Sequence, residues 1–137
     1  MTRSTRSTLV LLFVTAALGG CGDDDPVVTA PTSPVAVTEV LTETLTINGA
    51  RTHVIKVDNS GQISATLTTI PLDEGAFVSL SLGTWNGSSC QIIIAKDDAI
   101  QGTSVIGNAT VGQFCARVAD QGRLTAPVEY TVTVVHY

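Results

Sequence analysis

Hydrophobic and polar residues alternate along much of the chain after residue 39. Residues 63–68 alternate an apolar residue with Ser or Thr, and residues 128–134 alternate Val or Tyr with a polar residue. An alternation with a period of two places the apolar side chains on one face and predicts half-buried β-strands. Several such runs separated by Gly, Asn, Asp and Pro predict an all-β sandwich or barrel.

The local pattern also indicates how individual strands lie. Glu43 interrupts the apolar row of the first strand, which indicates a strand at a sheet edge or one whose start is exposed. Asn48-Gly49 is a strong signal for a hairpin between the first two strands. Three consecutive Ile residues, 92–94, predict a strand covered on both faces, and Lys96 to Gly112 is the least regular region. The strands are expected at residues 40–47, 52–57, 63–68, 78–82, 90–95, 113–118 and 127–137, with a short one at 104–106.

The first twenty residues have a different sequence pattern. Arg3 and Arg6 precede an apolar run at residues 9–18. About ten apolar residues are too few to cross a bilayer, which takes about twenty. A positive start followed by a short apolar run is typical of a secretory signal peptide.

Leu18-Gly19-Gly20-Cys21 resembles the lipobox of bacterial lipoproteins. The resemblance implies cleavage between Gly20 and Cys21, with diacylglycerol and further acyl chains such as palmitate on Cys21. More than one acyl chain gives stable membrane anchoring. The alternative is a conventional signal peptide that leaves a free Cys. In a host with two membranes, Gly22 after the Cys, rather than Asp, implies the outer membrane.

These features divide the chain into three parts. We expect a lipoprotein signal at 1–20, the lipidated Cys with a flexible linker at 21–39, and one β-sandwich domain at 40–137. The linker contains Pro and Thr without apolar periodicity, as is typical of an extended spacer. Three Asp residues at 23–25 are interpreted as part of this solvated spacer rather than as calcium ligands.

The charge of the chain limits its possible partners, and its cysteine content predicts a disulfide. Two of the seven basic residues precede Cys21, so five basic and twelve acidic residues follow, a net charge of −7. Such an acidic chain argues against nucleic acid as a partner and against electrostatic docking on anionic lipids. In an oxidising compartment Cys90 and Cys115 are expected to form a disulfide. The alternative is two unpaired buried thiols.

Little in the sequence indicates catalysis. His53 and His136 are the only candidate bases at neutral pH, and both lie within alternating strand patterns. The sequence contains no nucleophile elbow, zinc-protease motif or phosphate-binding Gly loop. We therefore expect no enzyme, no cofactor and no metal site, and a lipid-anchored structural or protein-interaction module at the cell envelope.

A ligand-binding module is the alternative function. Trp85 and Asn86 in a predicted turn, together with Asp97 and Asp98 in a predicted loop, are the candidate residues for a carbohydrate or a calcium-dependent ligand. An exposed aromatic ring beside polar groups suits a sugar, although a single Trp beside a strand more often covers a core. The expected partners are therefore the membrane, through the lipid, and an envelope protein or polysaccharide.

The predicted strands also resemble the bacterial pre-peptidase C-terminal domain over residues 51–137. The resemblance implies a small jelly-roll-like antiparallel sandwich with a structural or binding role, and it carries over no catalytic residue. Phe77 or Ser79 stands where that family has an Asp, so no calcium role is implied there. The family pattern turns Cys115 away from the core, so a bridge to Cys90 would lie on an outer face or require Cys90 to sit in the turn at residues 86–89. The matching stretches are His53-Val54-Ile55-Lys56-Val57, Gly61-Gln62-Ile63-Ser64-Ala65-Thr66-Leu67, Val78-Ser79-Leu80-Ser81-Leu82, Gly112-Gln113-Phe114-Cys115-Ala116-Arg117-Val118 and Tyr130-Thr131-Val132-Thr133-Val134.

Overall fold

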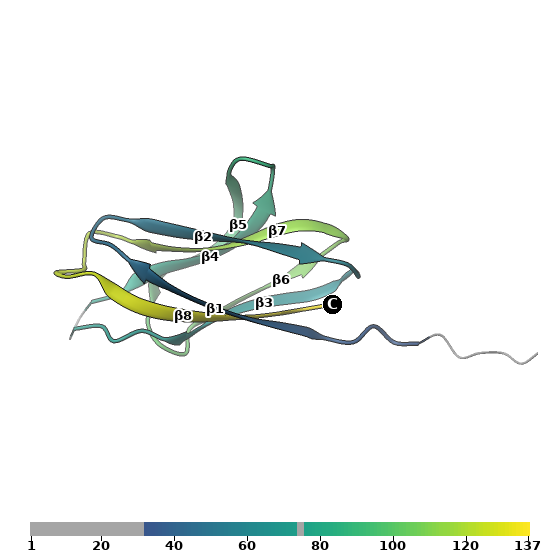
Figure 1. Ribbon diagram of the computed structural model, residues 1–137, viewed down its shortest axis with the longest axis horizontal. Coiled ribbons are helices and arrows are strands. Elements are labelled where there is room, and N and C mark those ends of the chain that lie inside the picture. The colour runs from purple at the N-terminus through teal and green to yellow at the C-terminus, as the bar shows by residue number, and fades with distance from the viewer. Residues whose placement is uncertain (1–31, 74–75) are drawn as a thin grey trace, which may run out of the picture. The chain divides into compact units, whose positions relative to one another are not determined.

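Eight antiparallel strands in two four-stranded sheets form the domain (Figure 1). The computed structural model describes residues 32–73 and 76–137, so the signal segment and Cys21 lie outside the described residues. The strands are β1 (Val37–Leu45), β2 (Ala50–Val57), β3 (Gly61–Thr69), β4 (Val78–Trp85), β5 (Cys90–Ala99), β6 (Ser104–Ala109), β7 (Gly112–Asp120) and β8 (Val128–His136).

The strand orders are β1-β8-β3-β6 in one sheet and β2-β7-β4-β5 in the other. The chain therefore changes sheet at almost every turn, and the first and last strands, β1 and β8, pair with each other. This is the order of a jelly roll, in which two Greek keys place the sheets face to face. The predicted all-β, jelly-roll-like sandwich is confirmed.

The core lies between the sheets and follows the predicted alternation. In β3 and β8 every second side chain is buried, while the hydroxyl-bearing residues between them are partly exposed. Burying an aliphatic side chain in this way contributes roughly 1.5 to 3 kcal/mol to the stability of the fold. The largest fully buried side chains are Tyr130, Leu45, Ile55, Ile63, Leu67, Leu80, Val57, Val78, Val105, Val118, Val132 and Val134.

The first strand differs from its prediction in two respects. It begins at Val37 and ends at Leu45, because β8 pairs with it from Val37, opposite His136, to Leu45, opposite Val128. As predicted from Glu43, it lies at a sheet edge. The predicted hairpin at Asn48-Gly49 is wrong, since β1 and β2 belong to different sheets. Asn48 has a φ of 53°, and this turn carries the chain across the sandwich.

The predicted burial of the three Ile residues is also wrong. Strand β5 forms the outer edge of its sheet, and Ile92, Ile93 and Ile94 are 50%, 70% and 38% exposed. An edge strand has a neighbour on one side only, and here the opposite sheet does not cover it. The residues after it are more regular than predicted, because β5 continues to Ala99 and β6 extends to Ala109. No helix in the described part of the chain is long and apolar enough to span a membrane.

Candidate functional site

The β4–β5 hairpin is the feature on which a candidate site can be built. Among the described strands, β4 and β5 are the only two that are consecutive and also paired with each other. Their turn is shaped by Asn86, whose side-chain oxygen accepts hydrogen bonds from the backbone N–H groups of Ser88, at 3.0 Å, and Ser89, at 2.8 Å. Gly87 supplies the positive φ of 97°. Asn86 therefore holds the turn, and its oxygen is already occupied.

A disulfide ties this hairpin to β7. Cys90 in β5 and Cys115 in β7 are bonded, with their Cα atoms 5.8 Å apart, as predicted. Both strands flank β4, and in a flat sheet two strands separated by a third lie about 10 Å apart. The sheet must therefore fold sharply between them. Because Phe114 and Ala116 are buried in the core, Cys115 faces the outside of the sheet, so the bridge lies on the outer face.

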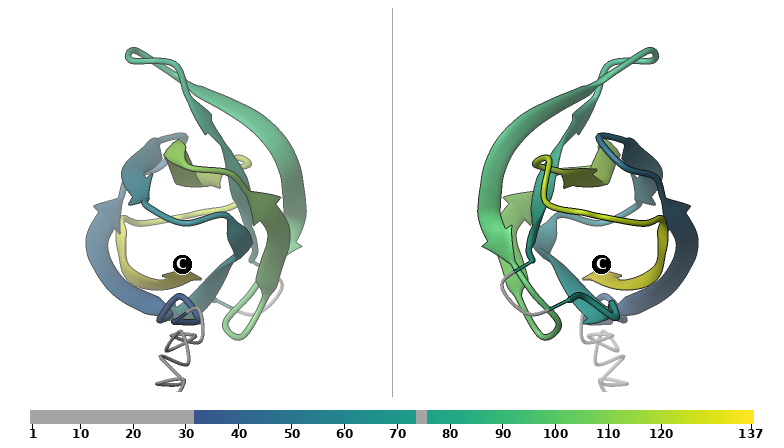
Figure 2. Two further views of the ribbon diagram at one scale, coloured as in Figure 1. Left: turned by 90° about the vertical axis from the view of Figure 1, so that its right-hand side faces the viewer. Right: turned by 90° about the vertical axis from the view of Figure 1, so that its left-hand side faces the viewer.

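The sharp bend in the sheet is centred on Gly83. Gly83 lies opposite Cys115 on one side and opposite Ile92 on the other. The pairing between β4 and β5 also shifts register between Leu82 and Gly83, which marks a bulge. A Cβ atom at Gly83 would collide with the carbonyl oxygen of Gln91, so only glycine allows this approach. The hairpin consequently stands out from the sheet beside β7 (Figures 1 and 2).

A hollow of about 820 Å³ lies between the hairpin and the neighbouring ends of β2 and β7. Trp85 and Cys90 lie on its hairpin side, while Arg51 and Arg117 come from β2 and β7. The structure thus places the predicted residue Trp85 at a concave surface. The full lining consists of Glu43, Ala50, Arg51, Thr52, Trp85, Ser88, Ser89, Cys90, Ile92 and Arg117.

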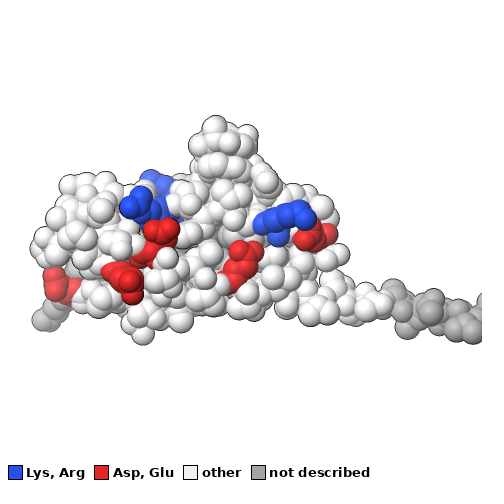
Figure 3. Space-filling model, in the orientation of Figure 1, with Lys and Arg blue, Asp and Glu red and all other residues white. Residues whose placement is uncertain are grey.

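The two arginines of the hollow have different surroundings. The Nε atom of Arg51 donates a hydrogen bond to the carbonyl oxygen of Thr44 at 3.1 Å, and it lies 3.9 Å from a carboxylate oxygen of Glu43. Arg117 has no side-chain hydrogen bond or ion pair with any residue in 32–73 or 76–137. In Figure 3 the basic side chains form small separate groups beside acidic ones, and the projecting lobe above them is white.

Asp97 and Asp98 are not brought to this site. They lie within β5 rather than in a loop, seven or more residues beyond Cys90, which is about 20 Å along a strand. Asp97 accepts a hydrogen bond from Ser79 at 2.7 Å and one from Gln121 at 3.4 Å. In the described ranges no group of three His, Cys, Asp or Glu side chains is placed to hold a metal ion. Asp97 therefore secures the far end of β5.

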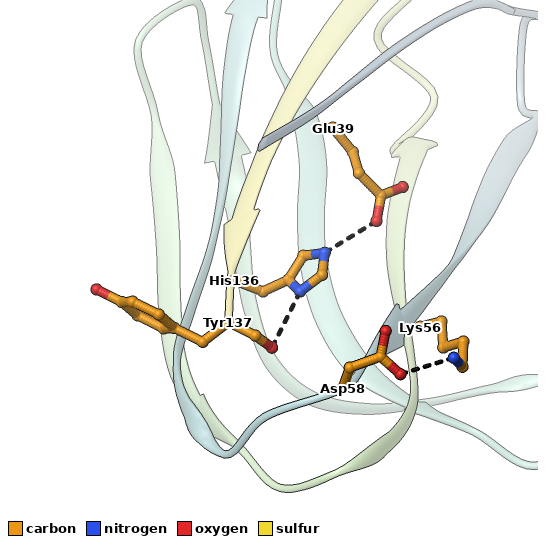
Figure 4. A network of polar contacts seen from close by, with 5 residues as sticks. All are labelled: Glu39, Lys56, Asp58, His136 and Tyr137. Atoms are coloured by element: carbon orange, nitrogen blue, oxygen red, sulfur yellow. Dashed lines mark hydrogen bonds and ion pairs between the residues drawn. The ribbon is translucent and has the colours of Figure 1, made fainter. Parts of the chain in front are cut away.

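Both histidines take part in internal contacts. The Nε2 atom of His53 lies 2.9 Å from the hydroxyl of Tyr130, and burial lowers the pKa of His53 despite the opposing effect of Glu43. His136 is 3% exposed, and its Nε2 atom lies 2.9 Å from Glu39, which joins β8 to β1 (Figure 4). These contacts agree with the prediction that the histidines belong to the strand pattern.

The residues missed by sequence reasoning are Arg51, Arg117 and Glu43. A signal for Arg117 was present, because Cys115 and Arg117 share one face of a strand by alternation. A bridge from Cys90 to Cys115 therefore brings the Trp85 turn beside Arg117. Arg51 and Glu43 had no comparable signal, because their approach depends on how β1 and β2 meet at one end of the sandwich.

Comparisons with known proteins show a structural similarity but no match to a family model or a curated sequence. No protein-family model matches the sequence, and no curated protein sequence matches it significantly. Among solved structures, the chain is similar to the pre-peptidase C-terminal domain of a collagenase from Bacillus anthracis. The two share 14% sequence identity with a TM-score of 0.47, over 69% of this chain and 87% of that one.

Proposed function

We propose that this chain is a lipid-anchored, non-catalytic interaction module at the cell envelope. In this account, lipid on Cys21 holds the chain at the membrane, the segment up to β1 acts as a spacer, and the sandwich presents the β4–β5 hairpin to a partner. In a host with two membranes the proposed location is the outer membrane. Partners would be an envelope protein or polysaccharide, reached without the basic surface that nucleic acid requires.

One observation carries the interaction role: the hairpin is uncharged, and its β5 edge exposes three Ile side chains. Residues 76–95 contain no Lys, Arg, Asp or Glu. Ile92, Ile93 and Ile94 lie exposed along the same edge. Contiguous exposed apolar surface is uncommon on soluble proteins and is typical of contact surfaces. The hairpin is therefore where we expect a partner to bind.

Site-specific photo-crosslinking in the native host tests this role. A photo-reactive amino acid placed at Ile93 should give defined crosslinked species, because that side chain is expected to lie against the partner. Val40 on β1 is a matched control, since it is exposed to a similar degree, 65% against 70% for Ile93, and lies on the far edge strand of the other sheet. Equal crosslinking from the two positions, or none from Ile93, would count against the proposal.

Anchoring is tested separately. Growth with a labelled fatty acid should label the wild-type chain and move it with the membrane fraction. Cys21→Ser should carry no label and should leave the membrane fraction, because the acyl chains supply the membrane affinity. An unlabelled wild-type chain, or a Cys21→Ser chain that remains membrane-bound, would contradict the anchor.

A second candidate function is ligand binding at Trp85. The hollow beside the hairpin favours it, because concave surfaces with a few polar groups are the usual sites for small ligands. Calcium is not part of this candidate, since Asp97 and Asp98 lie at the other end of β5. The ligand would be a saccharide in contact with the indole ring.

A further inference from the structure

We infer that the hollow beside the hairpin binds an acidic sugar, with the sugar carboxylate at Arg117 and the sugar ring against Trp85. This inference rests on the second candidate function above and names the class of its ligand.

The five basic residues after Cys21 differ in how they are paired. Two of them, Arg51 and Arg117, line the hollow. Elsewhere, Lys56 pairs with Asp58 at 2.6 Å, and the Arg123 guanidinium lies 4.8 Å from the centre of the Phe77 ring. Lys96 lies in β5, outside the hollow, and has no ion pair with a described residue. In a chain with an excess of acidic residues, an unpaired guanidinium in a concave site is the group best suited to receive an anion.

Arg117 is that group. Its backbone is fixed from both sides, by pairing with Thr52 of β2 and with Ser81 of β4, and the Ser81 hydroxyl donates to its carbonyl oxygen at 3.3 Å. Its guanidinium has no side-chain partner within the described ranges. A planar guanidinium can bind a carboxylate through two parallel hydrogen bonds. Arg51 is less free, because Glu43 and Thr44 already contact its Nε atom.

The surroundings of Arg117 favour a sugar as the carrier of the charge. Trp85 lines the hollow beside Ser88 and Ser89. Both serine hydroxyls donate to the Asn86 side-chain oxygen, and each keeps a lone pair that can accept a hydrogen bond from a sugar hydroxyl. Aromatic rings bind the apolar face of a sugar ring, while hydroxyl groups exchange hydrogen bonds with its edge. Glu43 faces the hollow next to Arg51 and opposes a second anion there. The arrangement therefore suits one carboxylate per bound unit.

The disulfide gives the hollow its shape before a ligand arrives. Cys90 itself lines the hollow, and its bond to Cys115 holds the hairpin beside β7. Arg117 lies two residues from Cys115, on the same face of β7 by alternation. A site that is rigid before binding loses less entropy on binding. Reduction of the disulfide should therefore weaken binding.

The test is a titration of the purified full chain followed by the fluorescence of Trp85, the single tryptophan. The probes are a galacturonic acid oligosaccharide and the same oligosaccharide with each carboxylate reduced to an alcohol. We expect the acidic probe to shift the Trp85 emission and to bind at least about tenfold more tightly than the neutral one, the size of effect typical of a charge-assisted hydrogen bond. Higher salt should weaken the acidic probe alone.

Variants separate the effect of the Arg117 guanidinium on binding from the effect of net charge. Arg117→Gln should lose the preference for the acidic probe, and Arg117→Lys should keep part of it. Arg123→Gln makes the same change of charge on the arginine that lies over Phe77, so it should bind as the wild type does. Thermal unfolding shows whether each variant is folded. If Arg117→Gln does not fold, the comparison of Arg117→Lys with the wild type still tests the role of Arg117.

The outcomes distinguish this inference from the function on which it rests. Equal binding of the two probes, or wild-type preference in Arg117→Gln, would overturn the acidic-sugar inference and leave a saccharide site at Trp85. Binding of neither probe would overturn both. Neither result would touch the lipid anchor or the protein contact at Ile93, which are measured by labelling and crosslinking.

Discussion

Strands β8 and β5 each carry an apolar run but hold different positions in the fold, one inside its sheet and the other at an edge. Both contain runs of β-branched residues, and both were predicted as strands with buried apolar side chains. In β8 the alternate side chains are buried because β1 and β3 flank the strand and the second sheet covers it. In β5 all side chains from Gln91 to Asp98 are exposed. The comparison teaches that strand order, rather than hydropathy, decides burial, and the exposure of Ile92, Ile93 and Ile94 is why we propose β5 as the contact surface.

The largest expected effect follows from removing the Cys90–Cys115 disulfide, which ties the β4–β5 hairpin to β7. The double variant Cys90→Ser with Cys115→Ser should lower the free energy of unfolding by about 3 to 4 kcal/mol, since the bridge spans 25 residues. Chemical denaturation measures this loss. Hydrogen exchange should quicken in β5 and remain slow in β8. Uniform quickening of both strands would show that the bridge does not act on the hairpin in particular.

A smaller effect concerns the bend that turns β5 outward. Gly83→Ala should lower stability by about 1 to 3 kcal/mol, because the new methyl group collides with the Gln91 carbonyl and forces the strands apart. Gly107→Ala is the matched control, since its nearest neighbour would be Ile63 Cγ2 at 4.0 Å. Equal unfolding midpoints for the two variants would contradict the close approach at Gly83.

Truncation of one side chain in each strand compares the two regions directly. Val134→Ala in β8 should cost about 2 kcal/mol, because the valine is fully buried. Ile93→Ala in β5 should cost less than about 0.5 kcal/mol, although it removes the larger side chain, because it is mostly exposed. Denaturant unfolding measures both. A cost at Ile93 as large as that at Val134 would mean that β5 is covered after all.

The smallest effect is a pH dependence at His53, which faces Tyr130 of β8. Burial lowers the pKa of His53, so the folded state favours the neutral ring. The stability that this group provides is complete above the unfolded pKa of about 6.5 and is lost as the pH falls below it. His53→Gln should therefore lose less stability than the wild type between pH 7.5 and pH 5.5. Parallel melting curves for the two proteins would contradict this assignment.

Much of the fold could be predicted because alternation is a local signal. The buried residues of β3 and β8 follow the predicted period of two, and the resemblance of these patterns to a jelly-roll family anticipated the architecture. Pairing could not be predicted in the same way. The turn at Asn48-Gly49 has hairpin chemistry, yet β1 pairs with β8, far along the sequence, because the first and last strands lie side by side in one sheet.

The site could be predicted only in part for a similar reason. Trp85 and the pairing of Cys90 with Cys115 followed from residue type and compartment. Their approach to Arg117 depends on the bend at Gly83, which a linear pattern does not contain. Asp97 and Asp98 were predicted to lie in a loop because several glycines follow them in an irregular stretch, but the bulged continuation of β5 carries them away from Trp85.

The most direct measurement is alkylation of the native protein in intact cells, without reduction, followed by mass spectrometry of its peptides. We predict no modified cysteine: lipid should block Cys21, and a peptide containing Cys90 should be found linked to one containing Cys115. Alkylation of Cys90 or Cys115 would show that no disulfide holds the hairpin beside β7. Alkylation of Cys21 would show that no lipid blocks this thiol and would contradict the membrane anchor.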